Sequence, residues 1–492
     1  MTRKIKPFSF LVIGISGCWF AALLLHLGAG LYFPQPFGDE SYFFYAAKSW
    51  AENSSFFAPE LHSGRTLYWM PFGYPFLAGL VLKWISPEFI GLRHLSFAGV
   101  SVAFFALCGF LIREKDAGWK IALTGLFLLS KPWLVCGNLA RMESWVLAFV
   151  GLAICFSRNQ YYRISWFCIF LGGILHPIGL AFAPFWLLFN GRDHHPSGYR
   201  DWLLPGLVAI PVLTVFYLGF PPDVSHILGD WQFQMAGKPA SECLILLFRA
   251  RSLGFFLLAG FLAFQFIRLN NRPNLLLTGL AVWLFLIRIY GRGDTYGIYT
   301  SLAMLLISVC LWDYLVLLAS RPVGLRMKKP MLFSCLILLL LGSQTLHLPL
   351  AGPFPSVSRS DIVQNKTYLQ PEEIQSIRHK ADSVCRAKQW KTLAIYPETI
   401  GCILYQKGLY FRQIIHNFED SRPDGILFFS AEGDSFGADR RQIYEGYHIR
   451  PETQINLGNS NWSMFPNTGK CLVRNRIDAL HRCRRAGMTC PK

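Results

Sequence analysis

The sequence predicts an all-α domain of many membrane-spanning helices, followed by a small soluble α/β domain. Of the 492 residues, 53% are hydrophobic and only 15% are charged, whereas roughly a quarter of the residues in a soluble protein are charged. Apolar runs long enough to cross a bilayer recur from residue 8 to about residue 350 and then stop. We therefore divide the chain into a membrane domain, residues 1–350, and an extracytoplasmic domain, residues 351–492.

Positive charge in the loops predicts how the chain crosses the membrane, because loops that stay in the cytoplasm are rich in Lys and Arg. Six such clusters lie at residues 3–6, 113–120, 158–163, 192–200, 268–272 and 321–329. If all six are cytoplasmic, the chain has about eleven membrane segments, a cytoplasmic N-terminus and a C-terminal domain on the outer face. Much of the net charge of +18 is then explained by Lys and Arg in cytoplasmic loops, and nucleic acid is not an expected partner.

The interval 164–190 decides this topology, because it reads at first as one long span. A single tilted span with a proline kink would place the basic cluster at 192–200 outside. Two short helices that break at His176-Pro177 keep that cluster inside, since proline disfavours helix in the residue before it and removes a hydrogen bond. We expect the two short helices.

An acidic pair, Asp39-Glu40, stands in the first outer loop, just beyond the first apolar run. Apolar residues after it recur at helical spacing, which predicts a helix with one apolar face lying in the membrane interface. The apolar positions are Phe43, Ala46, Ala47 and Trp50, with Lys48, Ser49 and Glu52 opposite. The pair occupies the first turn, where the helix dipole favours ionised carboxylates. Carboxylates so close to hydrocarbon indicate a functional site, and the alternative is a solvated loop in which Asp39 caps the helix.

The last part of the chain reads as a mixed α/β fold. We expect a helix over 371–389, short buried strands at 391–396 and 425–429, and a helix over 400–410 between them. Five of the 13 cysteines lie here, at Cys385, Cys402, Cys471, Cys483 and Cys490. On the outer face one or two disulfides are expected, and Cys471 is nearest in sequence to Cys483 and Cys490, although spacing does not fix the pairing.

Five segments within roughly the first 300 residues carry a family resemblance. They are Phe37-Gly38-Asp39-Glu40-Ser41-Tyr42, Tyr68-Trp69-Met70-Pro71-Phe72-Gly73-Tyr74-Pro75, Glu88 to Arg93, Ala140-Arg141-Met142-Glu143-Ser144 and Gly172-Gly173-Ile174-Leu175-His176-Pro177. In order, they resemble the first-loop acidic motif, the aromatic-proline segment, the start of the second span, the acidic head of the fourth span and the broken helix pair of the polytopic glycosyltransferases of the GT-C fold. Within that fold the chain resembles the bacterial protein O-mannosyltransferase and lipid A aminoarabinose transferase group. It departs from the pattern at Met70, where a lysine is common, and at Glu143, where Asp is more usual.

The resemblance implies transfer of a hexose or pentose from a polyprenyl-phosphate donor to an acceptor hydroxyl or phosphate on the outer face. The acceptor loses a proton as it attacks the anomeric carbon, and a carboxylate can take that proton. We assign Asp39 as the base, and Glu40 as the alternative base or as a group that positions substrate. Glu143 would line the same cavity. A single displacement inverts the anomeric centre.

The lipid phosphate that leaves needs cationic and hydrogen-bonding partners. We expect Arg288 and Arg292 to bind it, followed by Arg65 and Arg249, although an arginine at the end of a span can simply reach for the headgroups. Further candidates for contact with substrate are Tyr68, Tyr74 and His176. Their alternatives are an aromatic belt at the interface for the tyrosines and a structural hydrogen bond for the histidine.

We expect no cofactor and no metal, with Asp39, Glu40 and Glu143 as the oxygen ligands if a divalent ion takes part. The expected partners are the lipid-linked donor, a lipid, glycan or protein acceptor, and membrane lipids. The resemblance implies an integral protein of a bacterial inner membrane. Two rival functions remain, a polytopic transporter and a lipid-linked glycan ligase or acyltransferase. A transporter explains many spans and a buried acid but not a long patterned outer loop, and no inverted repeat is seen.

Overall fold

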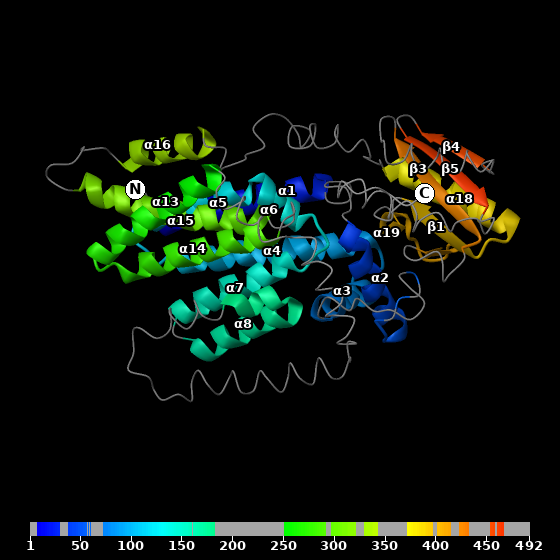
Figure 1. Ribbon diagram of the computed structural model, residues 1–492, viewed down its shortest axis with the longest axis horizontal. Helices are drawn as coiled ribbons and strands as arrows, with labels where there is room; N and C mark the ends of the chain where they lie inside the picture. The colour runs from blue at the N-terminus through cyan, green and yellow to red at the C-terminus, as the bar shows by residue number, and fades with distance from the viewer. Residues whose placement is uncertain are drawn as a thin grey trace, which may run out of the picture. The chain divides into compact units, whose positions relative to one another are not determined.

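A computed structural model of the chain (Figure 1) forms two units. It describes residues 7–29, 38–56, 58, 60, 72–159, 161–182, 250–291, 297–320, 329–342, 371–396, 401–414, 423–431, 453–457 and 460–466. The first, here called the membrane unit, comprises Met1–Leu31, Tyr68–Tyr74 and Arg93–Val357. The second, here called the loop–tail unit, comprises Tyr32–Leu67, Pro75–Leu92 and Ser358–Lys492.

The membrane unit is built from apolar helices. In chain order they are α1 (Pro7–Ala29), α4 (Phe89–Leu111), α5 (Ala117–Leu128), α6 (Lys131–Gly137), α7 (Glu143–Arg158), α8 (Tyr162–Leu175), η1 (Pro177–Phe182), α13 (Ala250–Arg268), α14 (Arg272–Gly291), α15 (Gly297–Ala319) and α16 (Lys329–Gly342). The first turn of α4 belongs to the loop–tail unit. Within the described residues, α4 and α15 are each long and apolar enough to span a bilayer, and α5 with α6 makes a third candidate that bends by 62°.

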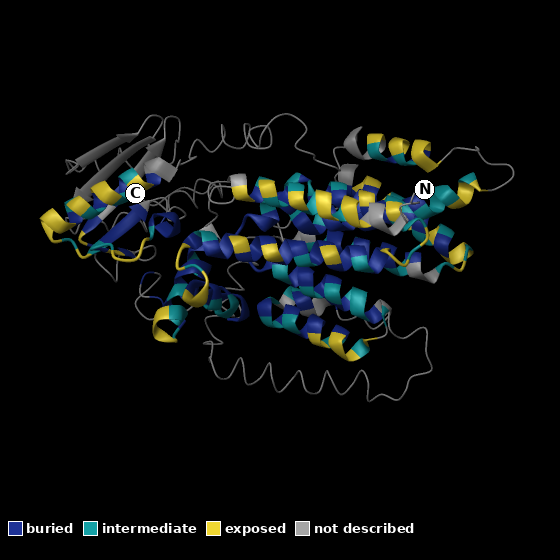
Figure 2. Cartoon of the chain, turned by 180° about the vertical axis from the view of Figure 1, so that it is seen from behind, coloured by how far each residue is buried: buried dark blue, intermediate teal, exposed yellow. Residues whose placement is uncertain are grey.

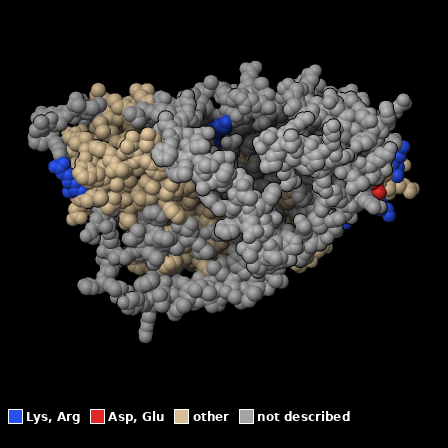
Figure 3. Space-filling model, in the orientation of Figure 1, with Lys and Arg blue, Asp and Glu red and all other residues tan. Residues whose placement is uncertain are grey.

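The surface of these helices is what a lipid environment favours. Large apolar side chains are exposed along them, including Ile13, Leu257 and Phe264 at 61–65% exposure (Figure 2). The face in Figure 3 shows only small patches of Lys and Arg on a largely uncharged described surface. The chain is therefore an integral membrane protein. The count of about eleven spans stays a prediction, because residues 183–249 and 343–370 lie outside the described residues.

The predicted break at His176-Pro177 is confirmed. Helix α8 ends at Leu175, His176 is extended with φ −159° and ψ 140°, and Pro177 opens the short 3-10 helix η1, which lies against α8. Two glycines permit this return, because a Cβ on Gly179 would collide with the backbone of Gly172. The second short helix predicted after the break extends into residues outside the described part.

The segment between α5 and α7 begins with the short helix α6. Ser130 precedes α6 and Pro132 occupies its first turn, a position where proline needs no hydrogen-bond partner. Trp133 and Leu134 are then buried.

A buried ion pair ties three helices of the membrane unit together. Lys120 of α5 lies with its Nζ 2.8 Å from Asp313 Oδ1 of α15, and its side chain is 2% exposed. Asn274 of α14 donates from Nδ2 to the same carboxylate at 3.0 Å. Charges in an apolar surrounding need such partners, so the pair fixes the register of α5, α14 and α15.

The loop–tail unit combines two helices of the first outer region with the end of the chain. These are α2 (Gly38–Asn53) and α3 (Gly73–Trp84), although α3 begins in the membrane unit, together with α18 (Pro371–Lys388) and α19 (Gly401–Leu404). Five strands form one sheet, β1 (Thr392–Tyr396), β2 (Arg412–Ile414), β3 (Gly425–Ala431), β4 (Thr453–Leu457) and β5 (Ser460–Pro466). The strand order is β2-β1-β3-β5-β4, with β1 parallel to β2 and β3, and β5 antiparallel to β3 and β4.

Helix α18 and strands β1 and β3 form where the sequence predicted them. One face of α18 is buried at Ile374, Ile377, Ala381 and Cys385, which is helical spacing. Burial raises the pKa of the Cys385 thiol to about 12, so it stays protonated. The helix expected over 400–410 is shorter, since only Gly401–Leu404 is helical. The proposed pairing of Cys471 with Cys483 or Cys490 falls on residues outside the described part.

Removing the cation of the Lys120–Asp313 pair should destabilise the membrane unit. Lys120→Met leaves the Asp313 carboxylate without its cation, and we expect the free energy of unfolding to fall by about 3 kcal/mol. The double variant Lys120→Met with Asp313→Leu should regain most of it, because the closely paired carboxylate is removed with its cation and the more distant Glu114, 3.9 Å from Lys120 Nζ, is partly exposed to solvent. Unfolding of the purified protein in detergent measures both. A double variant no more stable than Lys120→Met would contradict this role.

Candidate functional site

The membrane unit holds a buried ion pair at the start of α7. Arg141 lies with its Nη2 2.8 Å from Glu143 Oε1, and its Nε donates to both carboxylate oxygens at 3.1 Å. The exposed fractions are 4% for Arg141 and 3% for Glu143. Glu143 also occupies the first turn of α7, where the helix dipole favours a carboxylate. The charge-assisted contact holds the guanidinium in one orientation.

Hydrogen bonds attach this pair to two neighbouring elements. The Ser96 hydroxyl of α4 and the Ser144 hydroxyl of α7 donate to the Arg141 carbonyl, at 3.4 and 3.3 Å. Tyr74, at the start of α3, lies with its hydroxyl 3.4 Å from Ser96 Oγ. Tyr74, Ser96 and Ser144 are all fully buried. The turn that carries Arg141 and Glu143 is thus held from α3, α4 and α7.

The break after α8 contributes a histidine to the same neighbourhood. His176 Nδ1 accepts a hydrogen bond from the backbone N–H of Ile178 at 3.1 Å, so the neutral ring carries its proton on Nε2. Helix η1, which begins directly after His176, packs against α7, and Gly172 lies near Val146 in the first turns of α7. The structure therefore brings together three predicted site residues, Tyr74, Glu143 and His176, around Arg141. We call these four residues with Ser96 and Ser144 the Arg141 cluster.

Arg141 was not among the residues proposed from the sequence, nor was Arg93, which is fully buried in α4. A charged side chain buried among membrane helices indicates function. The sequence signal was present in both cases. Arg141 stands two residues before the predicted acid, and Arg93 interrupts an apolar run. Both were read as parts of family-like segments rather than as candidates themselves.

A second polar cluster joins α1 to α4 and to the residue after α6. His26 Nε2 lies 2.7 Å from His94 Nδ1, and His26 Nδ1 is hydrogen-bonded to Asn138 Oδ1. The ring of His26 stacks on Phe97 at 4.3 Å. Each nitrogen of His26 has a neighbour, so this cluster ties helices together.

The acidic pair of the first outer loop lies in the loop–tail unit, in the first turn of α2. The Glu40 side chain is fully buried, whereas the Asp39 side chain lies outside the described residues. The expected division of α2 into an apolar and a polar face is only partly present. Ser41 is buried as fully as Phe43, because protein packs on more than one side of α2.

Other predicted site residues cannot be placed. Arg65, Tyr68, Arg249 and Arg292 lie outside the described residues, and Arg288 belongs to α14 but its side chain is outside them too. Among the described side chains, no group of three or more His, Cys, Asp or Glu residues lies close enough to hold a metal ion. Since the Asp39 side chain is not among them, metal independence stays a prediction.

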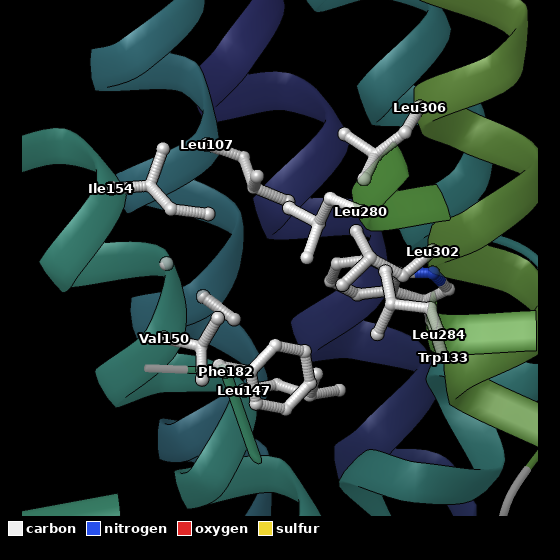
Figure 4. A pocket seen from close by; sticks show the side chains of 12 residues that line it. Leu107, Trp133, Leu147, Val150, Ile154, Phe182, Leu280, Leu284, Leu302 and Leu306 are labelled. Carbon is white, nitrogen blue, oxygen red and sulfur yellow. The ribbon is translucent and has the colours of Figure 1, made fainter. Parts of the chain in front are cut away.

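A small apolar hollow inside the membrane unit has a volume of about 20 Å³ (Figure 4). Side chains of α7 on one side and of α14 and α15 on the other converge on it. It is lined by Ala103, Leu107, Trp133, Leu147, Val150, Gly151, Ile154, Phe182, Leu280, Leu284, Leu302 and Leu306. No charged side chain lines it, so it suits hydrocarbon and cannot bind a phosphate or a sugar.

Comparison with protein-family models gives no match, and comparison with curated proteins gives none either. Two solved structures are similar to the chain, ArnT from Cupriavidus metallidurans bound to undecaprenyl phosphate, and the same protein in the apo state. Each is 12% identical and the match covers 94% of this chain and 98% of that chain, with TM-scores of 0.49 and 0.46.

Proposed function

We propose that this protein is a glycosyltransferase that moves a hexose or pentose from a polyprenyl-phosphate donor to an acceptor hydroxyl or phosphate on the outer face of the membrane. The observation that carries the proposal is the burial of Glu40 beside Asp39, at the start of a helix in an integral membrane protein. Burying a carboxylate is costly, and such groups persist where chemistry uses them. The Arg141 cluster adds a cation, a hydroxyl and an imidazole in the membrane unit.

Asp39 acts as the base in the proposed reaction. It takes the proton of the acceptor hydroxyl as the oxygen attacks the anomeric carbon of the sugar. The bond from that carbon to the phosphate oxygen breaks at the same time, and polyprenyl phosphate leaves with the bonding electrons. An acceptor phosphate is already an anion and gives up no proton. One displacement inverts the anomeric carbon. Glu40 positions substrate or takes over as base.

The leaving phosphate requires cations. Arg288 and Arg292 are the first candidates from the sequence, and the geometry adds Arg141. The ion pair with Glu143, two residues away, orients the guanidinium of Arg141. An arginine orientated in this way can hold a phosphate with little further loss of side-chain freedom.

A contact within the loop–tail unit supports the proposed orientation in the membrane. Tyr45 of α2 hydrogen-bonds to Gln413 of β2. Since the two residues can meet only if their segments lie on the same side of the bilayer, the first loop and the tail share one face. This agrees with an outer position for both, with the N-terminus in the cytoplasm of a bacterial cell.

The direct test is the release of polyprenyl phosphate. The purified full chain is incubated with a panel of polyprenyl-phosphate hexoses and pentoses and with extracted envelope lipids, glycans and proteins as acceptors. Release of the lipid phosphate together with a new glycosidic bond is the expected result. Movement of the intact donor across a vesicle membrane without release would indicate a transporter. Transfer of a whole oligosaccharide with loss of a pyrophosphate would indicate a glycan ligase.

Removing the basicity of Asp39 should abolish most of the turnover. Asp39→Asn keeps the size of the side chain, and we expect the turnover number to fall by about a hundredfold or more while donor binding persists. Glu40→Gln should cost less. Kinetics of the two purified variants against the unmodified chain give the comparison. The reverse order of effects would make Glu40 the base, and normal transfer by both variants would remove the carboxylates from the mechanism.

Neutralising the arginines near the end of α14 should weaken use of the donor. Arg288→Ala and Arg292→Ala each remove a charge-assisted hydrogen bond worth roughly 1.5–3 kcal/mol. We therefore expect a raised KM for the donor, with the KM for the acceptor little changed. Steady-state kinetics with each substrate varied in turn separate the two. If both variants keep normal donor kinetics, the phosphate contact passes to Arg65, Arg249 or Arg141.

A further inference from the structure

The helix that carries the proposed base is held from the C-terminal tail. A carboxylate in a first turn moves with its whole helix, and a shift of about 1 Å in a reacting group costs up to a hundredfold in rate. The groups that fix α2 therefore bear on the reaction. On one side Trp50 packs on Phe76 of α3 with ring centroids 4.7 Å apart. Gly79 of α3 leaves no room for a side chain, since a Cβ there would press on Trp50.

On another side the fully buried Tyr45 reaches the tail. Its hydroxyl is hydrogen-bonded to the side-chain amide of Gln413 in β2 and lies 3.3 Å from the carbonyl oxygen of Gly401 in α19. Burial raises the pKa of the Tyr45 hydroxyl well above its ordinary value, so the group keeps its proton. If Gln413 turns its Nε2 toward Tyr45, the phenol oxygen accepts from the amide and donates to Gly401. Either arrangement anchors α2 to the tail.

Tyr405, directly after α19, makes a second anchor. Its hydroxyl donates to Glu52 Oε1 at 3.2 Å, its ring centroid is 5.4 Å from that of Phe44, and Lys48 Nζ lies 4.8 Å from the ring centroid. Lys48 is itself held by Glu60, at 2.8 Å from Nζ to Oε1. The contact thus combines an aromatic pair, a cation over a ring and a hydrogen bond to a carboxylate.

The two anchors lie on one stripe of α2. Residues Phe44, Tyr45, Lys48 and Glu52 fall within about 100° of the helix circumference, at 3.6 residues per turn. Tyr45 and Glu52 are about 10 Å apart along the axis, so together they fix both the rotation and the axial position of the helix. The tail therefore holds α2 by one face.

The tail presents these anchors on a rigid element. Arg378 of α18 donates from Nε to the carbonyl oxygen of Leu404 and from Nη2 to that of Tyr405, both at 3.1 Å, and also bonds to the carbonyl of Ile403. These are carbonyls at the C-terminal end of α19, which lack partners inside so short a helix. The arginine fixes α19, and with it Tyr405, relative to α18.

We propose that Gly401, Tyr405 and Gln413 of the tail position the acidic pair of α2, so that the C-terminal tail takes part in the reaction without contributing a group to substrate. The inference rests on the proposed function, because it concerns the same carboxylates. Tyr45, Tyr405 and Gln413 act through α2 and are positioning residues.

The test uses the full-length double variant Tyr45→Phe with Tyr405→Phe and the single variant Tyr405→Phe. Both variants keep the aromatic rings and remove only hydroxyl groups. Because Tyr405 is partly exposed, the single variant Tyr405→Phe alters no fully buried side chain and is expected to fold. The matched control is Tyr410→Phe in the same tail, whose ring lies 5.4 Å from the guanidinium of Arg386 on α18. Amide hydrogen exchange of α2 and steady-state kinetics with the polyprenyl-phosphate sugar that the unmodified chain uses best are measured on each.

In the double variant we expect amide exchange in α2 to rise about tenfold or more and the turnover number to fall by about tenfold to a hundredfold. The KM for the donor should change little, and Tyr405→Phe should lie between the double variant and the unmodified chain. The control should match the unmodified chain in both measurements. Unchanged exchange in α2, or faster exchange with a normal turnover number, overturns the positioning role. Absence of sugar transfer by the unmodified chain counts instead against the proposed function, and the exchange measurement still reports whether the tail holds α2.

Discussion

The cost of carrying charge out of water governs the structure. A carboxylate or an ammonium group in an apolar surrounding is destabilising by several kcal/mol unless a partner of opposite charge and further hydrogen bonds compensate it. The chain meets this cost at Lys120 with Asp313 and at Arg141 with Glu143. Asn274 donates a further hydrogen bond to the Asp313 carboxylate, and Ser96 and Ser144 hold the backbone carbonyl of Arg141.

The two ion pairs solve the same problem with different consequences. Lys120 and Asp313 are far apart in sequence, and their pair, with Asn274, joins α5, α14 and α15. The burial of that pair is explained by its role in holding the three helices together. Arg141 and Glu143 are neighbours on one turn, and their contact orients the guanidinium. The same turn is held by hydroxyls from α4 and α7, and Tyr74 of α3 lies against one of them.

Sequence patterns predicted the features that depend on local physics. The break at His176-Pro177 follows from the backbone restriction of proline, and α18, β1 and β3 follow from their hydrophobic periods. Local patterns could not predict the hydrogen bond between Tyr45 and Gln413, because these residues are 368 positions apart in the sequence. They also missed α6, because seven residues carry little periodic signal. Arg141 was overlooked because closeness in sequence to a predicted acid does not show that the two side chains form an ion pair.

The helix that carries the proposed base, α2, depends for part of its packing on residues far away in the sequence. The unit joins Tyr32–Leu67 and Pro75–Leu92 to Ser358–Lys492, so its two parts are far apart in sequence. Contacts over such separations carry a large loop-closure entropy and form late. Helix α2 therefore gains Gly401 and Gln413 as partners later than it gains its nearby contact with α3. Under the positioning role inferred above, the acidic pair reaches its working geometry only after these long-range contacts have formed.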